Sequence, residues 1–573
     1  MVTSRKTRRL LGSALCALWL GAALPGCTAI VDYDSAQCDN TQDCLDRGLT
    51  DTVCSADKTC VRELDFCQTN AQCIDRAGRA EFICDKSVNR CVELTTKECP
   101  NLLPRNNKVD AYLRSENVLL LGLEGIPNAQ APLLSHANAL ELAQDDFETT
   151  EGGIPGPNGE KRHVVMVSCE LEPFQTQGLR TSMDHLINVV KTPVIFGPFP
   201  LNFMSIALPI AIDNDVMLFT GGYEIGDNFQ DNPARVGILF NNNYSANVLV
   251  PTSNQLLTKV LEPTIRKDLE LDDDEPIRVA VVRSGDTAQE GFVSELFATM
   301  EYNGLSAAEN NIQGNYEEFD FGQLADPMVS GNVIDTALKV AEYQPHVVVL
   351  TFAAEQAIPL ILAIEDAYPD IAHYINPPSA VFPALQTWVG SDLSRKRRVW
   401  NVLGGQDYAD RDYQRLVNRL ESTYPDGPKG LLFAGYVGAP SYDQYYFTMY
   451  GIHANWVAGP DGSPLPETGS NIGNAMLTKL TSGMYFNDSR GPQNSILPVT
   501  SRLLRGESVI VKGAFTDSRF DGSGNLSTKG LVMCLRTAED IAKNVEDPFM
   551  QSGLFYDPTT QELTGLDNNK CLE

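Results

Sequence analysis

Residues 117–148, NVLLLGLEGIPNAQAPLLSHANALELAQDDFE, decide the fold class of most of this chain. The stretch opens with the apolar run NVLLLGL, which is typical of a buried strand, and after a turn of small residues it continues as the helix-like segment LELAQDDFE. A strand followed by a helix is the repeating unit of α/β proteins. The stretch therefore predicts the first unit of a parallel sheet.

Strand-like and helix-like segments alternate from about residue 110 onward. Further strand-like runs are HVVMVSC from 163, TPVIFG from 192, DVMLFTGG from 215, IRVAVVRSG from 277, PHVVVLTF from 345 and RVWNVLGG from 398. This alternation favours right-handed βαβ units with a sheet buried between helices. Because the runs form two series, we predict an α/β fold with two doubly wound, Rossmann-like lobes and with ligands at the carboxyl ends of the strands.

Composition and charge exclude several classes of partner. The 573 residues carry 44 lysines and arginines against 74 aspartates and glutamates, a formal net charge of -30 at pH 7. Such a surface repels phosphate backbones and anionic lipid, so we exclude nucleic-acid binding and expect any membrane attachment to come from acyl chains. A hydrophobic content of 43% suffices for more than one core.

The first 27 residues carry an export signal. Four basic residues between positions 5 and 9 precede the apolar or small run at 10–24, as in secretory signals. LPGC at 24–27 resembles the lipobox of bacterial lipoproteins, which implies removal of residues 1–26 and lipidation of Cys27. An ordinary signal peptide with an incidental cysteine is the alternative. By the same resemblance, Thr28 in place of a retaining aspartate favours the outer membrane.

A duplicated cysteine module follows the signal, with repeats at 38–61 and 67–92. Each repeat has Cys-Leu/Ile-Asp-Arg after its second cysteine and Cys-Val at its fourth. Neither holds enough large apolar residues to fold unaided, so we predict two structural disulfides in each and interpret residues 27–99 as a cross-linked stalk or docking module. Zinc is the alternative, but no C-x2-C pair is present. The cysteines are Cys38, Cys44, Cys54, Cys60, Cys67, Cys73, Cys84 and Cys91. Their pairing stays open.

Four further cysteines lie outside the module. We expect Cys534 to pair with Cys571 and so to tie down a tail at 536–573, which leaves Cys99 and Cys169 to each other. A buried free thiol at Cys169 is the alternative.

The ordered motifs between about 110 and 535 resemble the type I periplasmic binding proteins, especially the branched-chain amino-acid receptor group. VLLLGLEGIP with its helix is similar to the family's opening unit, and Gly197-Pro198 is similar to its turn after the third strand. FTGGYE from 219 occupies the place of its serine/threonine turn, and VAVVRSGDTAQEGF from 279 resembles the opening of its second lobe. Ser441-Tyr442-Asp443 and GAFTDSRFDGSGNLS from 513 are similar to its late motifs.

The resemblance implies two lobes that close about a hinge crossed three times by the chain. It places lobe 1 at 110–248 plus 407–485 and lobe 2 at 249–406 plus 486–535.

Candidate ligand contacts follow the strand ends of both lobes. They are Glu124, Asn202, Thr220, Gly221, Tyr223, Asp286, Thr287 and Gln289. A helix-cap, turn or solvated-loop role is the alternative, because Asp, Asn and Thr also satisfy open N–H groups.

The chain departs from the amino-acid binders of this family at three places. Residues 199–202, FPLN, offer no hydroxyl for a carboxylate, Ala288 stands where a tyrosine is frequent, and INPPSAVF from 375 lacks the acid that holds an ammonium group. An α-amino acid is therefore one candidate ligand, and a less charged or larger solute is another.

No catalytic, metal or cofactor motif is present. G-x-S-x-G, G-x-x-x-x-G-K-[ST] and H-E-x-x-H are all missing, and we interpret DGSGN at 521–525 as a tight turn rather than a calcium loop. We therefore expect no enzyme but a lipid-anchored, extracytoplasmic solute-binding protein that delivers a small polar ligand to an ABC-type permease. The alternative is a sensory or protein-interaction lipoprotein of the envelope that uses the same fold without transport.

Overall fold

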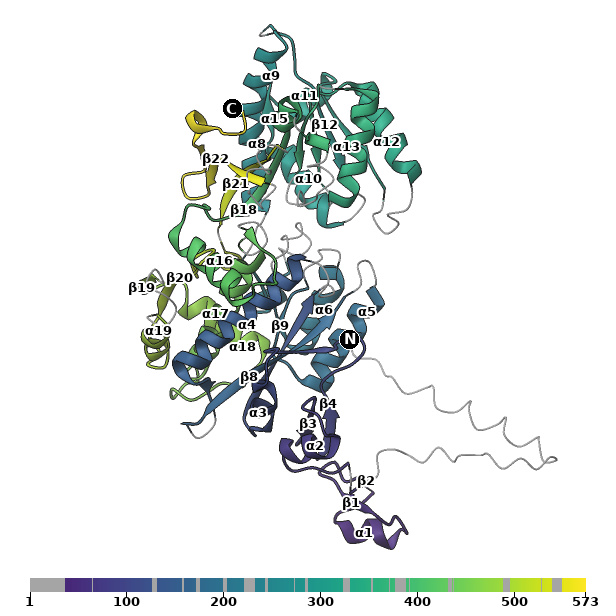
Figure 1. Ribbon diagram of the computed structural model, residues 1–573, viewed down its shortest axis with the longest axis vertical. Coiled ribbons are helices and arrows are strands. Elements are labelled where there is room, and N and C mark those ends of the chain that lie inside the picture. The colour runs from purple at the N-terminus through teal and green to yellow at the C-terminus, as the bar shows by residue number, and fades with distance from the viewer. Residues whose placement is uncertain are drawn as a thin grey trace, which may run out of the picture. The chain divides into compact units, whose positions relative to one another are not determined.

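The computed structural model describes residues 37–572 with internal gaps (Figure 1). The residues left out within that range are 64, 126–130, 157–158, 172–175, 199–202, 221–231, 243–245, 273, 284–286, 323–329, 352–353, 370, 377–387, 391, 431–434, 436, 488–494, 527 and 538–548. Cys27 and the predicted signal lie outside the described residues. No helix of the described part is long and apolar enough to cross a membrane.

Two compact units divide the chain, and the first contains the first cysteine repeat. Helix α1 (Thr41–Asp46) begins at a capping box. The side chain of Asn40 accepts the backbone N–H of Asp43, and the side chain of Asp43 accepts the backbone N–H of Asn40. Strands β1 (Thr52–Cys54) and β2 (Cys60–Arg62) form an antiparallel pair. The disulfides Cys38–Cys54 and Cys44–Cys60 join the first cysteine to the third and the second to the fourth.

The second repeat has the same plan and the same order of pairing. It consists of α2 (Asn70–Ala77), β3 (Phe82–Asp85) and β4 (Arg90–Glu93), with the disulfides Cys67–Cys84 and Cys73–Cys91. Ile74 and Leu94 are buried in the same apolar cluster as α3 (Lys108–Arg114), and the Asn70 side chain donates to the carbonyl of Ser115 at 3.0 Å. Most of the second repeat therefore belongs with lobe 1, although Asp85–Arg90 is grouped with the first unit, whereas the sequence predicted one separate stalk over 27–99.

Lobe 1 is built on a mainly parallel sheet of strand order β11-β10-β9-β6-β8-β5, with β7 paired to β8. The strands are β5 (Asn101–Leu103), β6 (Val118–Gly125), β7 (Ile154–Pro155), β8 (Lys161–Glu170), β9 (Val194–Phe196), β10 (Met217–Thr220) and β11 (Leu239–Asn241). Its helices include α4 (Ala131–Glu151), α5 (Thr176–Asp184), α6 (Met204–Asn214), α16 (Arg411–Thr423), α17 (Gly438–Asn455) and α18 (Gly469–Lys479).

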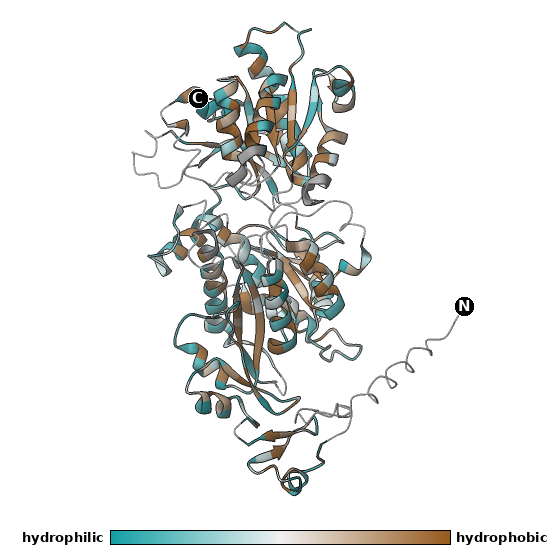
Figure 2. Cartoon of the chain, turned by 90° about the vertical axis from the view of Figure 1, so that its right-hand side faces the viewer, coloured by the Kyte–Doolittle hydropathy of each residue, from teal (hydrophilic) through white to brown (hydrophobic). Residues whose placement is uncertain are grey.

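Alternate residues of the strands belong to two separate apolar layers of lobe 1, one on each face of the sheet. On β6, Leu119, Leu121 and Leu123 pack with α4 and α17, whereas Leu120 faces α5 and α6. Residues of one strand point to opposite faces in turn, so a strand buried on both faces must be apolar throughout. Figure 2 shows this pattern as apolar strands inside helices whose outer faces are hydrophilic.

Lobe 2 contains a second sheet of order β15-β12-β16-β17-β18-β21-β22-β23, of which the first five strands are parallel. The strands are β12 (Val279–Arg283), β15 (Tyr316–Asp320), β16 (Val347–Leu350), β17 (His373–Asn376), β18 (Val399–Gly405), β21 (Lys529–Leu535), β22 (Phe549–Asp557) and β23 (Glu562–Thr564). Its helices include α8 (Ala246–Leu256), α9 (Glu262–Asp268), α10 (Thr287–Thr299), α11 (Ala307–Ile312), α12 (Ser330–Tyr343), α13 (Ala354–Ala367) and α15 (Leu393–Arg398).

In the described part, the chain passes between the two sheets three times. The passages run from β11 to α8, from β18 to α16, and from β20 (Val509–Lys512) to β21. At the first and third, Asn241 and Asn525 form a bridge, and the N–H of Leu526 donates to the carbonyl of Asn241 at 2.9 Å. Asp521 accepts the N–H groups of Ser523 and Asn525, so this segment is a hydrogen-bonded turn.

The C-terminal boundaries differ from those that the sequence predicted. Strand β19 (Met484–Asn487) pairs with β20, and α19 (Ile496–Leu503) packs against α4 and α17, so this part of the predicted lobe 2 segment 486–535 lies with lobe 1. The predicted tail at 536–573 supplies β22 and β23 to the lobe 2 sheet. The Cys534–Cys571 disulfide fastens it, and Cys99–Cys169 joins the start of lobe 1 to β8. Both are the pairs that we expected.

Candidate functional site

The carboxyl ends of β6, β9 and β10 meet at one edge of the lobe 1 sheet. The parallel register places Leu123 beside Phe196 and Phe196 beside Phe219. The N–H of Gly197 donates to the carbonyl of Phe219 at 2.9 Å, and Gly197 has a φ of 109°, a conformation that favours glycine. A Cβ at Gly197 would overlap the carbonyl oxygen of Glu124. The predicted turn therefore joins the ends of neighbouring strands where α/β sheets bind ligands.

Glu124 is fully buried at the end of β6, and its side chain faces the α5 side of the sheet. The hydroxyl of Ser182 donates to the carbonyl of Leu179 at 3.0 Å, and neither carboxyl oxygen of Glu124 has a hydrogen-bond partner within the described residues. Burial raises the pKa of Glu124 to about 8, and Ser182 offsets this only in part. At neutral pH this side chain is a protonated acid rather than an anion.

Thr220 ends β10 and is also buried. Its hydroxyl donates to the carbonyl of Pro198 at 3.1 Å. This contact is a turn role of the kind given as the alternative, and ligand contact by Thr220 stays a prediction.

The other predicted ligand contacts cannot be assembled into a site from the structure. Asn202, Gly221, Tyr223 and Asp286 lie outside the described residues. Thr287 and Gln289 lie in the first turn of α10, directly after the carboxyl end of β12, and their side chains lie outside the described part.

Asp443 has a structural role at the third passage that the sequence did not reveal. It lies on α17, is 1% exposed, and accepts the backbone N–H groups of Ala514, Phe515 and Thr516 at 2.8, 2.9 and 3.0 Å. Gly513 lies so close to this carboxylate that a Cβ there would overlap it. Two motifs quoted separately from the sequence, at 441–443 and from 513, thus form one anchor that fixes the passage to lobe 1.

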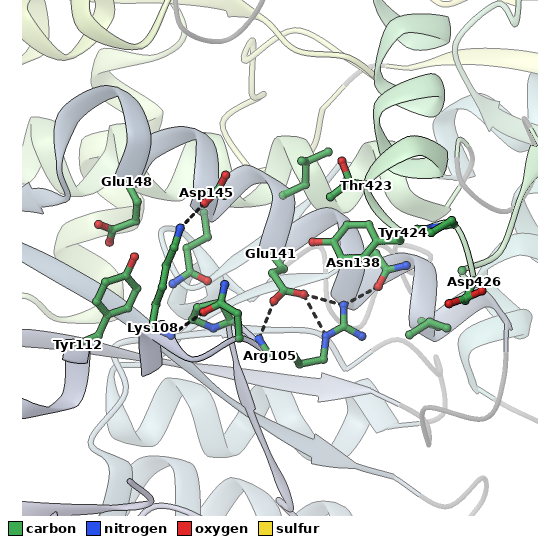
Figure 3. Close-up of a pocket in the computed structure, with 17 residues that line it drawn as sticks. Arg105, Lys108, Tyr112, Asn138, Glu141, Asp145, Glu148, Thr423, Tyr424 and Asp426 are labelled. Atoms are coloured by element: carbon green, nitrogen blue, oxygen red, sulfur yellow. Dashed lines mark hydrogen bonds and ion pairs between the residues drawn. The ribbon is translucent and has the colours of Figure 1, made fainter. Parts of the chain in front are cut away.

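A cavity of about 610 Å³ lies on lobe 1 between α4, the segment at 104–112 and the turn after α16 (Figure 3). Arg105 forms a double contact with Glu141, at 2.7 and 3.0 Å, and donates to Asn138 at 2.5 Å. Lys108 pairs with Asp145 at 2.8 Å. No motif in the sequence marked these residues, because three separate segments supply them.

The described residues contain two groups of cysteines that are close enough to hold a metal ion, but their sulfur atoms are in disulfides. The two groups of cysteines whose sulfur atoms lie within 4.8 Å of one another are Cys38, Cys44, Cys60 and Cys67, Cys73, Cys91. Every member is in a disulfide, so their thiolates cannot ligate an ion.

Comparison with known proteins identifies the fold. No family model matches the chain, and no curated protein matches it. Among solved structures, a leucine-binding protein from Thermotoga maritima matches with a TM-score of 0.51 and 13% identity over 78% of this chain and 99% of that one. A putative branched-chain amino acid ABC transporter protein from Silicibacter pomeroyi gives 0.51 and 14% over 79% and 100%.

A periplasmic binding protein from Burkholderia mallei gives a TM-score of 0.53 with 9% identity, over 80% of this chain and 99% of that one. These matches, at 9–14% identity, show a shared fold. The chain has the fold of the type I periplasmic binding proteins, preceded by disulfide-linked cysteine repeats.

Proposed function

We propose that the protein is a lipid-anchored, extracytoplasmic solute-binding protein that closes its two lobes around a small polar solute, amino-acid-like or related, and delivers it to an ABC-type permease. The observation that carries the proposal is the pair of α/β lobes linked by three passages of the chain, because such a hinge lets one solute contact both lobes and favour the closed state. The strand ends around Gly197 and Thr220 supply the lobe 1 side of the site. No catalytic step is assigned.

Export and anchoring are supported by the cysteines and by the N-terminal sequence. Twelve cysteines form six disulfides, as is usual in an oxidising, extracytoplasmic compartment. The basic and apolar N-terminus with LPGC at 24–27 supports a lipid on Cys27. Thr28 favours the outer membrane as the location.

The second candidate is a sensory or protein-interaction lipoprotein of the envelope. The state of two predicted ligand groups favours it, since Glu124 is enclosed and Thr220 is bonded to Pro198. In this case the two lobes form a binding surface for another envelope protein rather than a solute carrier.

Titration of tryptophan fluorescence with fractionated metabolite pools tests the first candidate. The chain contains four tryptophans, one of which, Trp400, is fully buried on β18, and we expect closure of the lobes to change their combined emission. We expect a saturable response that Tyr223→Ala abolishes and Tyr485→Ala retains, because Tyr485 is an exposed tyrosine on β19. A chain that responds to no pool but retains an envelope partner after Tyr223→Ala would show that the second candidate is correct.

A further inference from the structure

The cavity of lobe 1 has an unequal balance of charge. Its wall carries Glu141, Asp145, Glu148 and Asp426 against the cations Arg105 and Lys108. Arg105 is bound to Glu141 and Lys108 to Asp145, so each cation has its own carboxylate. Glu148 and Asp426 form no direct ion pair with a lysine or arginine among the described residues, although Lys108 is close enough to Glu148 to favour its charged form.

Glu148 is enclosed and only half satisfied. Its side chain is 8% exposed, and Oε2 lies 2.8 Å from Nδ1 of His163, whereas Oε1 has no hydrogen-bond partner in the described part of the chain. Burial raises the pKa of Glu148, although His163, the backbone N–H of Val164 and the charge of Lys108 favour the charged form. The buried Oε1 of Gln144, which also lines the cavity, lacks a partner too. Enclosed acceptors without donors are costly, and a ligand that brings N–H groups removes that cost.

The two unpartnered carboxylates lie at opposite ends of the cavity. Figure 3 shows Glu148 beside Tyr112 at one end and Asp426 beside Tyr424 at the other. A Cβ on Gly427 would lie 2.8 Å from Nδ2 of Asn138, so the Asp426 end lies next to Asn138. Ten residues of α4 separate Asn138 from Glu148, which corresponds to about 15 Å along the helix.

Beside the Arg105–Glu141 and Lys108–Asp145 ion pairs, the length between these ends is lined by apolar groups (Figure 3). They are Pro104, Leu134, Leu142 and Pro425, together with the rings of Tyr112 and Tyr424. Such a wall suits methylene groups, with the ring of Tyr112 stacked on His163 at 4.1 Å and the guanidinium of Arg105 lying 5.6 Å from the centre of the Tyr424 ring.

We infer that this cavity binds an elongated aliphatic amine with a positive charge at each end, one ammonium group at Glu148 and the other at Asp426. The site is separate from the strand ends that carry the proposed function, and it does not depend on closure of the lobes.

Calorimetric titration of the full chain with 1,8-diaminooctane tests the inference. Octylamine, with one charge, and 1,3-diaminopropane, which is too short, are the comparison ligands. We expect one saturable site for the long diamine and binding at least about tenfold weaker for both comparison ligands, because each engages only one of the two carboxylates. Equal affinity for octylamine, or no saturable binding of the diamine, overturns the inference.

Two variants locate the site. Glu148→Gln and Asp426→Asn each remove one charge, and each is expected to weaken the diamine about tenfold. Asp461→Asn is the matched control, because Asp461 is exposed and lies outside the cavity wall. Asp426 is exposed, so its variant reports on binding even if Glu148→Gln disturbs folding. Unchanged affinity in Asp426→Asn overturns the inference, and Tyr223→Ala is expected to retain diamine binding.

Discussion

The carboxylate of Asp443 occupies the space that a side chain at Gly513 would need, and it binds three consecutive N–H groups just beyond that glycine. The two residues lie far apart in the sequence, on α17 and in the third passage between the sheets. Their contact fixes the start of that passage, up to residue 516, to lobe 1.

Substitution at this anchor is expected to destabilise the fold. Asp443→Ala leaves three buried N–H groups without an acceptor, which costs at least about 3 kcal/mol of the free energy of unfolding. Gly513→Ala places a methyl group against the carboxylate and has a similar effect. Urea unfolding measures both. Gly522→Ala is the control, because its Cβ would meet no atom within 4 Å, and an equal loss in that variant would contradict the account.

The buried acid Glu124 is expected to reduce stability at neutral and alkaline pH. Its pKa is raised from 4.5 to about 8, so the native state keeps a proton that the unfolded chain releases above pH 4.5. The resulting loss grows as the pH rises from 4.5 and levels off above 8. The free energy of unfolding of Glu124→Gln should therefore be about 3 kcal/mol higher than that of the parent at pH 9, and the two should not differ in this way at pH 4. A gain that does not vary between these pH values would mean that Glu124 is not the titrating group.

Glu151 is expected to have the opposite dependence. Burial raises its pKa, but His453, Thr500 and Lys161 outweigh this and lower the pKa from 4.5 to about 2. Nε2 of His453 lies 2.9 Å from Glu151, and Nδ1 lies 2.7 Å from the carbonyl of Met449, so both ring nitrogens face oxygen acceptors. A lowered pKa contributes stability above pH 4.5 that is lost as the pH falls towards 2.

Chemical unfolding of Glu151→Gln between pH 2 and 7 checks this dependence. We expect a deficit of about 2–3 kcal/mol at pH 6 that shrinks towards pH 2. Glu317→Gln, at an exposed acid of lobe 2, should show no deficit. A deficit of constant size would indicate lost packing rather than lost charge.

The Cys534–Cys571 disulfide is expected to hold β22 and β23 on the lobe 2 sheet. It closes a segment with a sequence separation of 37, for which chain entropy gives about 4 kcal/mol of stabilisation. The double variant Cys534→Ser and Cys571→Ser should lose most of this, and hydrogen exchange should increase first in residues 549–564. Unchanged protection there would show that strand pairing alone holds the tail.

The sequence predicted the features that depend on local pattern. Apolar runs such as NVLLLGL became central strands because a strand covered on both faces has no polar side, and the spacing of the repeats indicated two disulfides in each. The C-terminal strands were missed, since β22 contains Gln551, Ser552 and Gly553 and gains its place only by pairing with β21. The cavity was missed because its charged residues come from segments that lie together only after folding.

The predicted ligand contacts rested on resemblance to a family, and the sequence alone could not show how the side chains at the strand ends are packed. A buried strand end does not show from its sequence whether its side chain points to a ligand or into the protein. The structure shows that Glu124 is buried and that the hydroxyl of Thr220 donates to the carbonyl of Pro198, and ligand contact by either residue stays a prediction.

The most direct test of solute binding is mass spectrometry of the small molecules released when the purified, full chain is denatured. We predict one polar solute in close to equimolar amount, present with the parent chain and with Asp426→Asn but missing with Tyr223→Ala. Release of no solute from the parent chain, or equal release from Tyr223→Ala, would contradict a site between the lobes.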